Sequence, residues 1–217
     1  MMPKQILGLL FIFVSLGGCA SGSVAPDWQI NVQGATERGI EAYLTGRTRI
    51  EESEFVRARA EIARTGDADL IARVELVRCA IRVASLVLED CVGFDRISQD
   101  TSSAERVYAD YLAGRLQARD AELLPPVHQR VLAGGAPALQ TIKDPLSRLV
   151  AAGVLFKNGQ ADPAVIAVAI DTASTQGWNR PLLAWLQIQS KRAELADDVM
   201  EVARIRRHID RILQTSR

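Results

Sequence analysis

The chain has 217 residues, of which 48% are hydrophobic, 24% charged and 5% aromatic, and 26 basic side chains balance 26 acidic ones. This composition is typical of a globular protein. A neutral chain has no net field to attract polyanions, so the composition argues against nucleic acid and against an anionic membrane surface as partners.

The first 19 residues have the pattern of a secretory signal that ends in a cysteine. Lys4 gives a positive start, residues 6–14 form an apolar stretch, and two glycines precede Cys19. The stretch is shorter than the roughly 20 apolar residues that a membrane span needs, and no later stretch reaches that length. We therefore expect a signal peptide and no membrane-spanning helix.

Leu16-Gly17-Gly18-Cys19 resembles the lipobox of bacterial lipoprotein precursors. The resemblance implies cleavage between Gly18 and Cys19, a diacylglyceryl group on the Cys19 thiol, and often an acyl chain on the new amine. Two or more chains anchor a protein stably to a membrane. In such precursors, an aspartate after the cysteine implies retention on the inner membrane. This chain has Ala20 at that position, so the resemblance implies an outer-membrane anchor with the domain facing the periplasm. The alternative is a plain secretory signal with a chance cysteine.

Removal of residues 1–18 would leave a short tether, residues 19–26, and a domain over residues 27–217. That length suits one substantial core, or two small domains that meet near residues 89–102 or 133–144.

The first half of this domain has three predicted helices. The first covers residues 28–44, and the second begins at a capping box, Thr48-Arg49-Ile50-Glu51, and ends at Gly66. Asp67 caps the third, which runs to about Leu88 and has two apolar faces. We expect this third helix to be central because both faces need a partner.

The second half begins with a predicted loop over residues 89–101. A second capping box, Ser102 to Glu105, opens a helix that Pro125-Pro126 ends, and a short helix at 127–132 stops at Gly134-Gly135. The remaining predicted helices cover 145–158, 163–176, 181–192 and 195–213. The sequence therefore predicts an all-α fold of about eight or nine helices, either an irregular bundle or stacked hairpins.

Residues 35–65 also show a weak repeat-like pattern. Gly39, Tyr43, Gly46, Phe55 and Ala58 are spaced in a way that resembles a tetratricopeptide helix pair. The resemblance implies a degenerate helical repeat, and a stack of such pairs would offer a concave surface to a partner. A shift of 34 residues does not reproduce the pattern, which favours an ordinary helical domain.

Two cysteines remain once Cys19 carries lipid. The oxidising periplasm favours a disulfide between Cys79 and Cys91, with two free buried thiols as the alternative. In one straight helix these residues would lie about 18 Å apart, so the bond requires the chain to turn back between them.

Catalytic motifs are scarce. The sequence has no nucleophile elbow, zinc-protease motif, phosphate loop or dinucleotide fingerprint, and the spacing of its residues suggests no metal or cofactor site. His128 and His208 are expected to be surface or capping side chains. Glu52-Ser53 resembles the catalytic Glu-Ser pair of lytic transglycosylases, but the family's downstream segment is missing.

Three functions remain open. The first is a lipid-anchored, non-enzymatic module that docks a protein of the cell envelope. The second is a structural or stress-related lipoprotein without a specific client. The third is a peptidoglycan-cleaving enzyme that uses Glu52. A small-molecule substrate has no support in the sequence.

Overall fold

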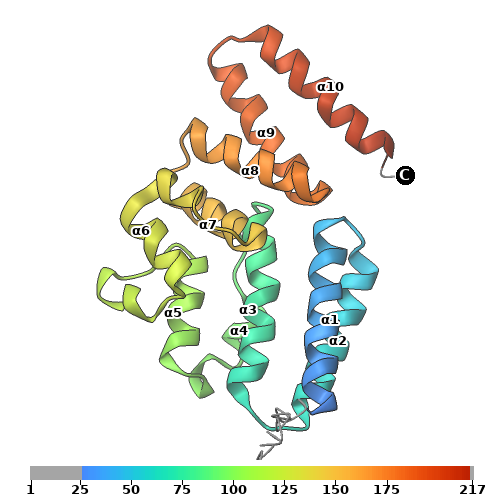
Figure 1. Cartoon of the computed structure of the whole chain (residues 1–217), viewed down its shortest axis with the longest axis vertical. Coiled ribbons are helices and arrows are strands. Elements are labelled where there is room, and N and C mark those ends of the chain that lie inside the picture. The colour runs from blue at the N-terminus through green and yellow to red at the C-terminus, as the bar shows by residue number, and fades with distance from the viewer. Residues whose placement is uncertain (1–25, 216–217) are drawn as a thin grey trace, which may run out of the picture.

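The computed structural model describes residues 26–215, so Gly18, Cys19 and the predicted signal peptide and tether up to residue 25 lie outside the described part. Within it the chain is all helical and has no strand, which confirms the predicted fold class (Figure 1). Among residues 26–215, nine helices have ten or more residues, and α4 is a single turn. The helices are α1 (Asp27–Leu44), α2 (Thr48–Ala63), α3 (Ala68–Ala84), α4 (Val92–Asp95), α5 (Ser103–Leu112), α6 (Pro126–Leu139), α7 (Pro145–Lys157), α8 (Pro163–Gln176), α9 (Asn179–Leu195) and α10 (Val199–Thr215).

The helices stack in a continuous series. The α1–α2 hairpin lies against α3, which packs on α5 and α7 on its other sides (Figure 1). Helices α7, α8 and α9 follow, and α10 folds back along α9. One apolar core joins them from Ala35 to Ile212, and α3 has the central place that its two apolar faces predict. None of the helices between residues 26 and 215 combines the length and the hydrophobicity of a membrane span.

Three helix starts follow the predicted capping chemistry. Asp67, Asp144 and Asp162 each accept a hydrogen bond from the backbone N–H three residues further on. Each bond satisfies one of the orphan donors of a first helical turn and contributes about 1 kcal/mol. Proline stands at the first helical position of α7 and α8, where its missing N–H costs nothing.

The capping box predicted at Thr48 is wrong. Helix α2 begins after Arg47, without a side-chain cap, and the Thr48 hydroxyl accepts a hydrogen bond from Arg180 at 2.9 Å. Glu51, the other member of the box, is buried and binds Arg78. Partners from distant parts of the chain therefore replace the local bonds that the pattern predicts.

The box predicted at Ser102 fails in the same way. Ser102 is the N-cap of α5, but its side chain makes no cap bond. Its backbone N–H donates to the Asp69 carboxylate at 2.7 Å, and Glu105 pairs with Arg73. These contacts fix the start of α5 beside the first turns of α3.

Several predicted boundaries also need correction. Helix α3 ends at Ala84 rather than near Leu88, because Leu86 adopts a left-handed conformation with φ of 58°. The predicted loop that follows contains the short helix α4. Helix α5 ends at Leu112, well before the prolines. The chain passes through a 3-10 segment, Ala118–Leu123, before α6 begins.

The last two corrections concern α6 and α10. Helix α6 is not confined to residues 127–132, since helical structure resumes after a kink at Gly135 and continues to Leu139. Helix α10 begins at Val199 rather than at residue 195, because α9 runs on to Leu195 and Asp197 turns the chain with φ of 56°.

Candidate interaction sites

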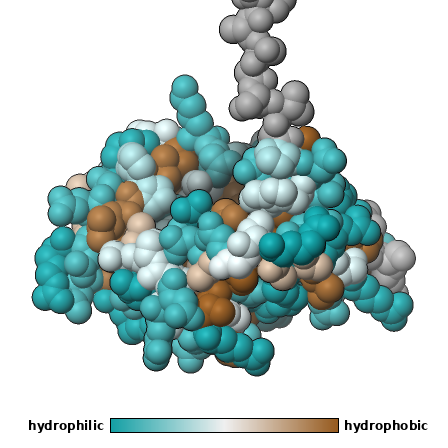
Figure 2. Space-filling model, turned by 90° about the horizontal axis from the view of Figure 1, so that it is seen from below, coloured by the Kyte–Doolittle hydropathy of each residue, from teal (hydrophilic) through white to brown (hydrophobic). Residues whose placement is uncertain are grey.

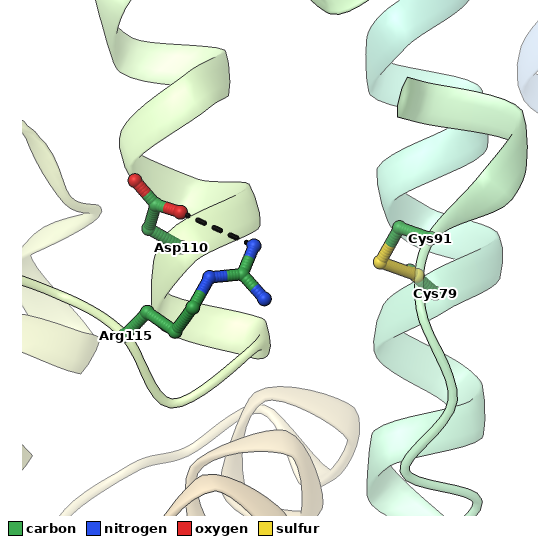
Figure 3. Close-up of a disulfide and its surroundings, with 4 residues drawn as sticks. All are labelled: Cys79, Cys91, Asp110 and Arg115. Atoms are coloured by element: carbon green, nitrogen blue, oxygen red, sulfur yellow. Dashed lines mark hydrogen bonds and ion pairs between the residues drawn. A yellow bond between two sulfur atoms is a disulfide. The ribbon is translucent and has the colours of Figure 1, made fainter. Parts of the chain in front are cut away.

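A disulfide joins Cys79 of α3 to Cys91, with 5.7 Å between the two Cα atoms (Figure 3). This is the pairing that the cysteine count predicts, and the left-handed turn at Leu86 reverses the chain as the bond requires. The bond holds the segment before α4 along the side of α3. A polar cavity of about 210 Å³ adjoins it, lined by acidic and basic side chains including Glu75, Arg78 and Arg82.

Buried ion pairs tie α2 to α3 beside this cavity. The Glu51 carboxylate accepts a hydrogen bond from Arg78 Nε at 2.9 Å, and Arg82 lies 3.7 Å away. Glu75 pairs with Arg59 at 2.9 Å. Each buried carboxylate thus has a cationic partner, which compensates part of the cost of removing charge from water. The arrangement explains how α2 keeps its register on α3.

An apolar groove lies between the first halves of α3 and α5 and has a volume of about 540 Å³. Leu76 and Leu124 form buried parts of its wall, while Leu123 remains well exposed. Figure 2, which shows the molecule from the lower end of Figure 1, displays apolar patches among hydrophilic side chains on that face. The apolar lining residues are Leu76, Val77, Ala104, Tyr108, Leu123, Leu124 and Pro125.

Two charged side chains line the same groove. Arg73 of α3 donates from Nε to Glu105 of α5 at 2.7 Å. This single bond occupies one of the five N–H donors of the guanidinium group. A groove of this volume with apolar walls and few polar groups has the general character of a ligand or peptide site.

A buried Tyr–His pair lies close to the groove. Tyr111 Oη and His128 Nδ1 are 3.0 Å apart, and the Tyr108 ring is 5.7 Å from the imidazole, measured between centroids. Burial lowers the pKa of His128 to about 4, an effect that Asp144 partly opposes. His128 is therefore neutral at pH 7. The prediction that it is a surface or capping residue is wrong, because the pair lies inside the core.

The turn between α9 and α10 exposes three large apolar side chains. Leu195 is 76% exposed, Val199 75% and Met200 80%. The turn itself is well formed: the Asp198 backbone N–H donates to Ala193 at 2.9 Å, and the Asp198 carboxylate accepts from the first turn of α10 at 3.0 Å. The apolar residues are therefore held outward by ordered backbone, and we call Leu195, Val199 and Met200 the hairpin tip.

Helix α10 carries four arginines, Arg204, Arg206, Arg207 and Arg211, and two of them pair with nearby carboxylates. Arg204 binds both oxygens of Glu201 at 2.6 Å, and Arg206 pairs with Glu194 of α9 at 3.2 Å. Exposed pairs of this kind contribute about 0–1 kcal/mol each. His208 lies half-buried on the same helix.

Both tryptophans of the C-terminal half connect helices. Trp178 Nε1 donates to Glu41 of α1 at 3.0 Å, and Trp185 Nε1 donates to the Ala84 carbonyl at the end of α3 at 3.1 Å. Both rings are buried. Trp178 therefore joins parts of the fold rather than forming an exposed binding patch.

Glu52 lies exposed on the surface of α2. It is one residue from the buried Glu51, so the helix turns one carboxylate inward and the other to solvent. The described residues contain no cluster of three or more side chains suited to a metal ion.

The sequence patterns predict neither the groove nor the hairpin tip. A partial signal for the tip exists, because Leu195 and Val199-Met200 bracket Asp197-Asp198, a turn-forming pair. The groove has no comparable signal, since its walls come from three separate segments. Comparison with known proteins adds no relative: no family model, no curated protein and no solved structure matches this chain.

Proposed function

We propose that this chain is a lipid-anchored protein of the bacterial cell envelope that acts as a non-enzymatic interaction module. Cys19 carries the anchor, and the hairpin tip binds a protein partner. The binding role of the hairpin tip rests on one observation: a well-formed turn holds three large apolar side chains exposed to solvent.

The positions of the two ends support this arrangement. The described chain starts with α1 at the lower end of the molecule, and the α9–α10 turn lies at the upper end (Figure 1). A short tether at Cys19 keeps the start of α1 near the membrane. The hairpin tip would then point away from the membrane, where it meets other envelope proteins rather than the anchoring bilayer.

The chemistry of the tip indicates what the partner offers. Full burial of a large apolar side chain contributes about 1.5–3 kcal/mol to binding, so the three side chains together can form the hot spot of an interface. Asp197 and Asp198 in the turn carry exposed negative charge beside these residues. A matching surface has an apolar pocket with basic residues around it.

Site-specific photocrosslinking in living cells tests the partner surface. A photoreactive residue at Met200 is expected to give an adduct of one discrete mass, and Met200→Asp should reduce co-purification of that same protein at least tenfold. Val56, which is 57% exposed on α2, is the matched control position. No adduct at Met200, or the same adducts at Val56, would count against the tip as the binding surface.

A further inference from the structure

The groove between α3 and α5 lies at the same end of the molecule as the start of α1. Asp69 in the first turn of α3 binds the backbone of Ser102 at 2.7 Å, so α3 and α5 begin side by side. Helix α2 ends at Ala63, shortly before α3 begins, and α1 runs antiparallel to α2 (Figure 1). The point where the tether enters the fold is therefore on the groove's end of the stack.

The length of the tether is sufficient to reach the groove. Seven residues, 19–25, separate the described chain from the end of the predicted signal peptide. A fully extended chain of this length spans about 23 Å. Packed helices lie about 8–10 Å apart, so the path from α1 past α3 to α5 covers roughly 16–20 Å. A lipid on Cys19 can therefore arrive at the groove without any change in the helices.

The lining of the groove suits an alkyl chain. Its wall is aliphatic and aromatic, and includes Leu76 from α3 and Tyr108 from α5. The two charged groups, Arg73 and Glu105, pair with each other. An unbranched acyl chain needs apolar contact along its length and no hydrogen-bond partner, which this wall supplies.

We infer that the groove between α3 and α5 shelters an acyl chain of the lipid on Cys19 when the protein is away from a bilayer. The inference rests on the proposed function, because it requires a lipid-modified Cys19. Water disfavours an exposed acyl chain in proportion to its length. A groove on the protein itself lowers that penalty while the protein crosses an aqueous compartment, and the bilayer takes the chain once the protein reaches it.

The first arm of the test asks whether the groove binds an alkyl chain. The probe is 11-(dansylamino)undecanoic acid, titrated into the mature chain that carries Cys19→Ser. This chain keeps the whole described core, because the core residues lie between Ala35 and Ile212. We expect saturable binding of one probe per chain. Ala104→Trp, which fills the mouth of the groove, should weaken it at least tenfold. Ala60→Trp, on the exposed face of α2, is the matched control and should change it less than twofold.

The second arm asks whether the chain's own lipid is the occupant. Lipid-modified wild type and the Cys19→Ser chain are compared by deuterium exchange in the same dilute detergent. We expect slower exchange over residues 103–124 in the lipid-modified protein, and no such difference in the Ala104→Trp background. Equal exchange in the two forms overturns the inference, as does failure of the Cys19→Ser chain to bind the probe. The intact mass of the wild type shows separately whether Cys19 is lipidated, so loss of the proposed function is distinguished from loss of this inference.

Discussion

Loss of the Cys79–Cys91 bond should lower stability by a predictable amount. The bond closes a short loop, with a sequence separation of 12. In the chain-entropy model, a loop of this size restricts the unfolded state by roughly 3 kcal/mol at 25 °C. The bond also fixes the segment that leads to α4, whose Phe94 is buried in the core. The double variant Cys79→Ala/Cys91→Ala should therefore lose about 3 kcal/mol of unfolding free energy.

Urea unfolding measures this loss. With a denaturant slope of about 2 kcal/mol/M, a loss of 3 kcal/mol moves the midpoint down by roughly 1.5 M. Addition of a reductant should move the wild-type midpoint by a similar amount and leave the double variant unchanged. The double variant controls for any effect of the reductant elsewhere.

Two results would refute this reasoning. A reductant that leaves the wild-type midpoint in place would show that the bond contributes nothing to stability. Alkylation of both Cys79 and Cys91 in the native, non-reduced protein would show that the bond is not formed at all.

The remaining predictions concern packing, pH and catalysis. Gly153→Ala should lower the unfolding free energy, measured by urea titration, by about 1–3 kcal/mol, because an added Cβ on α7 overlaps the Val83 backbone of α3. Gly34→Ala is the control, because only the flexible tip of a side chain lies near that position. Equal stability of the two variants would contradict the close crossing of α7 and α3. Burial lowers the pKa of His128 to about 4, so the unfolded state takes up a proton on this side chain before the folded state does as the pH falls below 6.5. The wild type should therefore lose up to about 3 kcal/mol of unfolding free energy between pH 6.5 and 4 that the His128→Gln variant does not lose. An equal loss in both proteins would disprove this role of His128. Glu52→Gln should leave muropeptide release from purified sacculi at the level of buffer alone, as should the wild type; release by the wild type that the variant abolishes would instead support an enzyme.

Local patterns predict the fold class and many helix ends in this chain. The starts at Asp67, Asp144 and Asp162 depend on bonds between residues three apart, which a sequence displays directly. The two capping boxes fail because Arg180 and Asp69 lie far from them in sequence and compete for the same groups. A pattern four residues long contains no information about such partners.

The same limit applies to the candidate sites. Cysteine count and compartment suffice to suggest the bond between Cys79 and Cys91. The burial of His128 depends on Tyr111, which belongs to a different helix. The groove depends on how α3, α5 and the segment before α6 meet, and the exposure of Met200 depends on where α9 ends. These features follow from tertiary packing. The sequence therefore reveals neither the groove nor the burial of His128, and the turn-forming pair Asp197-Asp198 is only a partial signal for the hairpin tip.

The intact mass of the mature protein, purified from cell membranes, shows whether Cys19 carries a lipid anchor. Anchoring through Cys19 predicts a chain that begins at this residue and carries the added mass of a diacylglyceryl group, with or without an acyl chain on the amine. An unmodified chain, or one cleaved at any other position, would contradict the account.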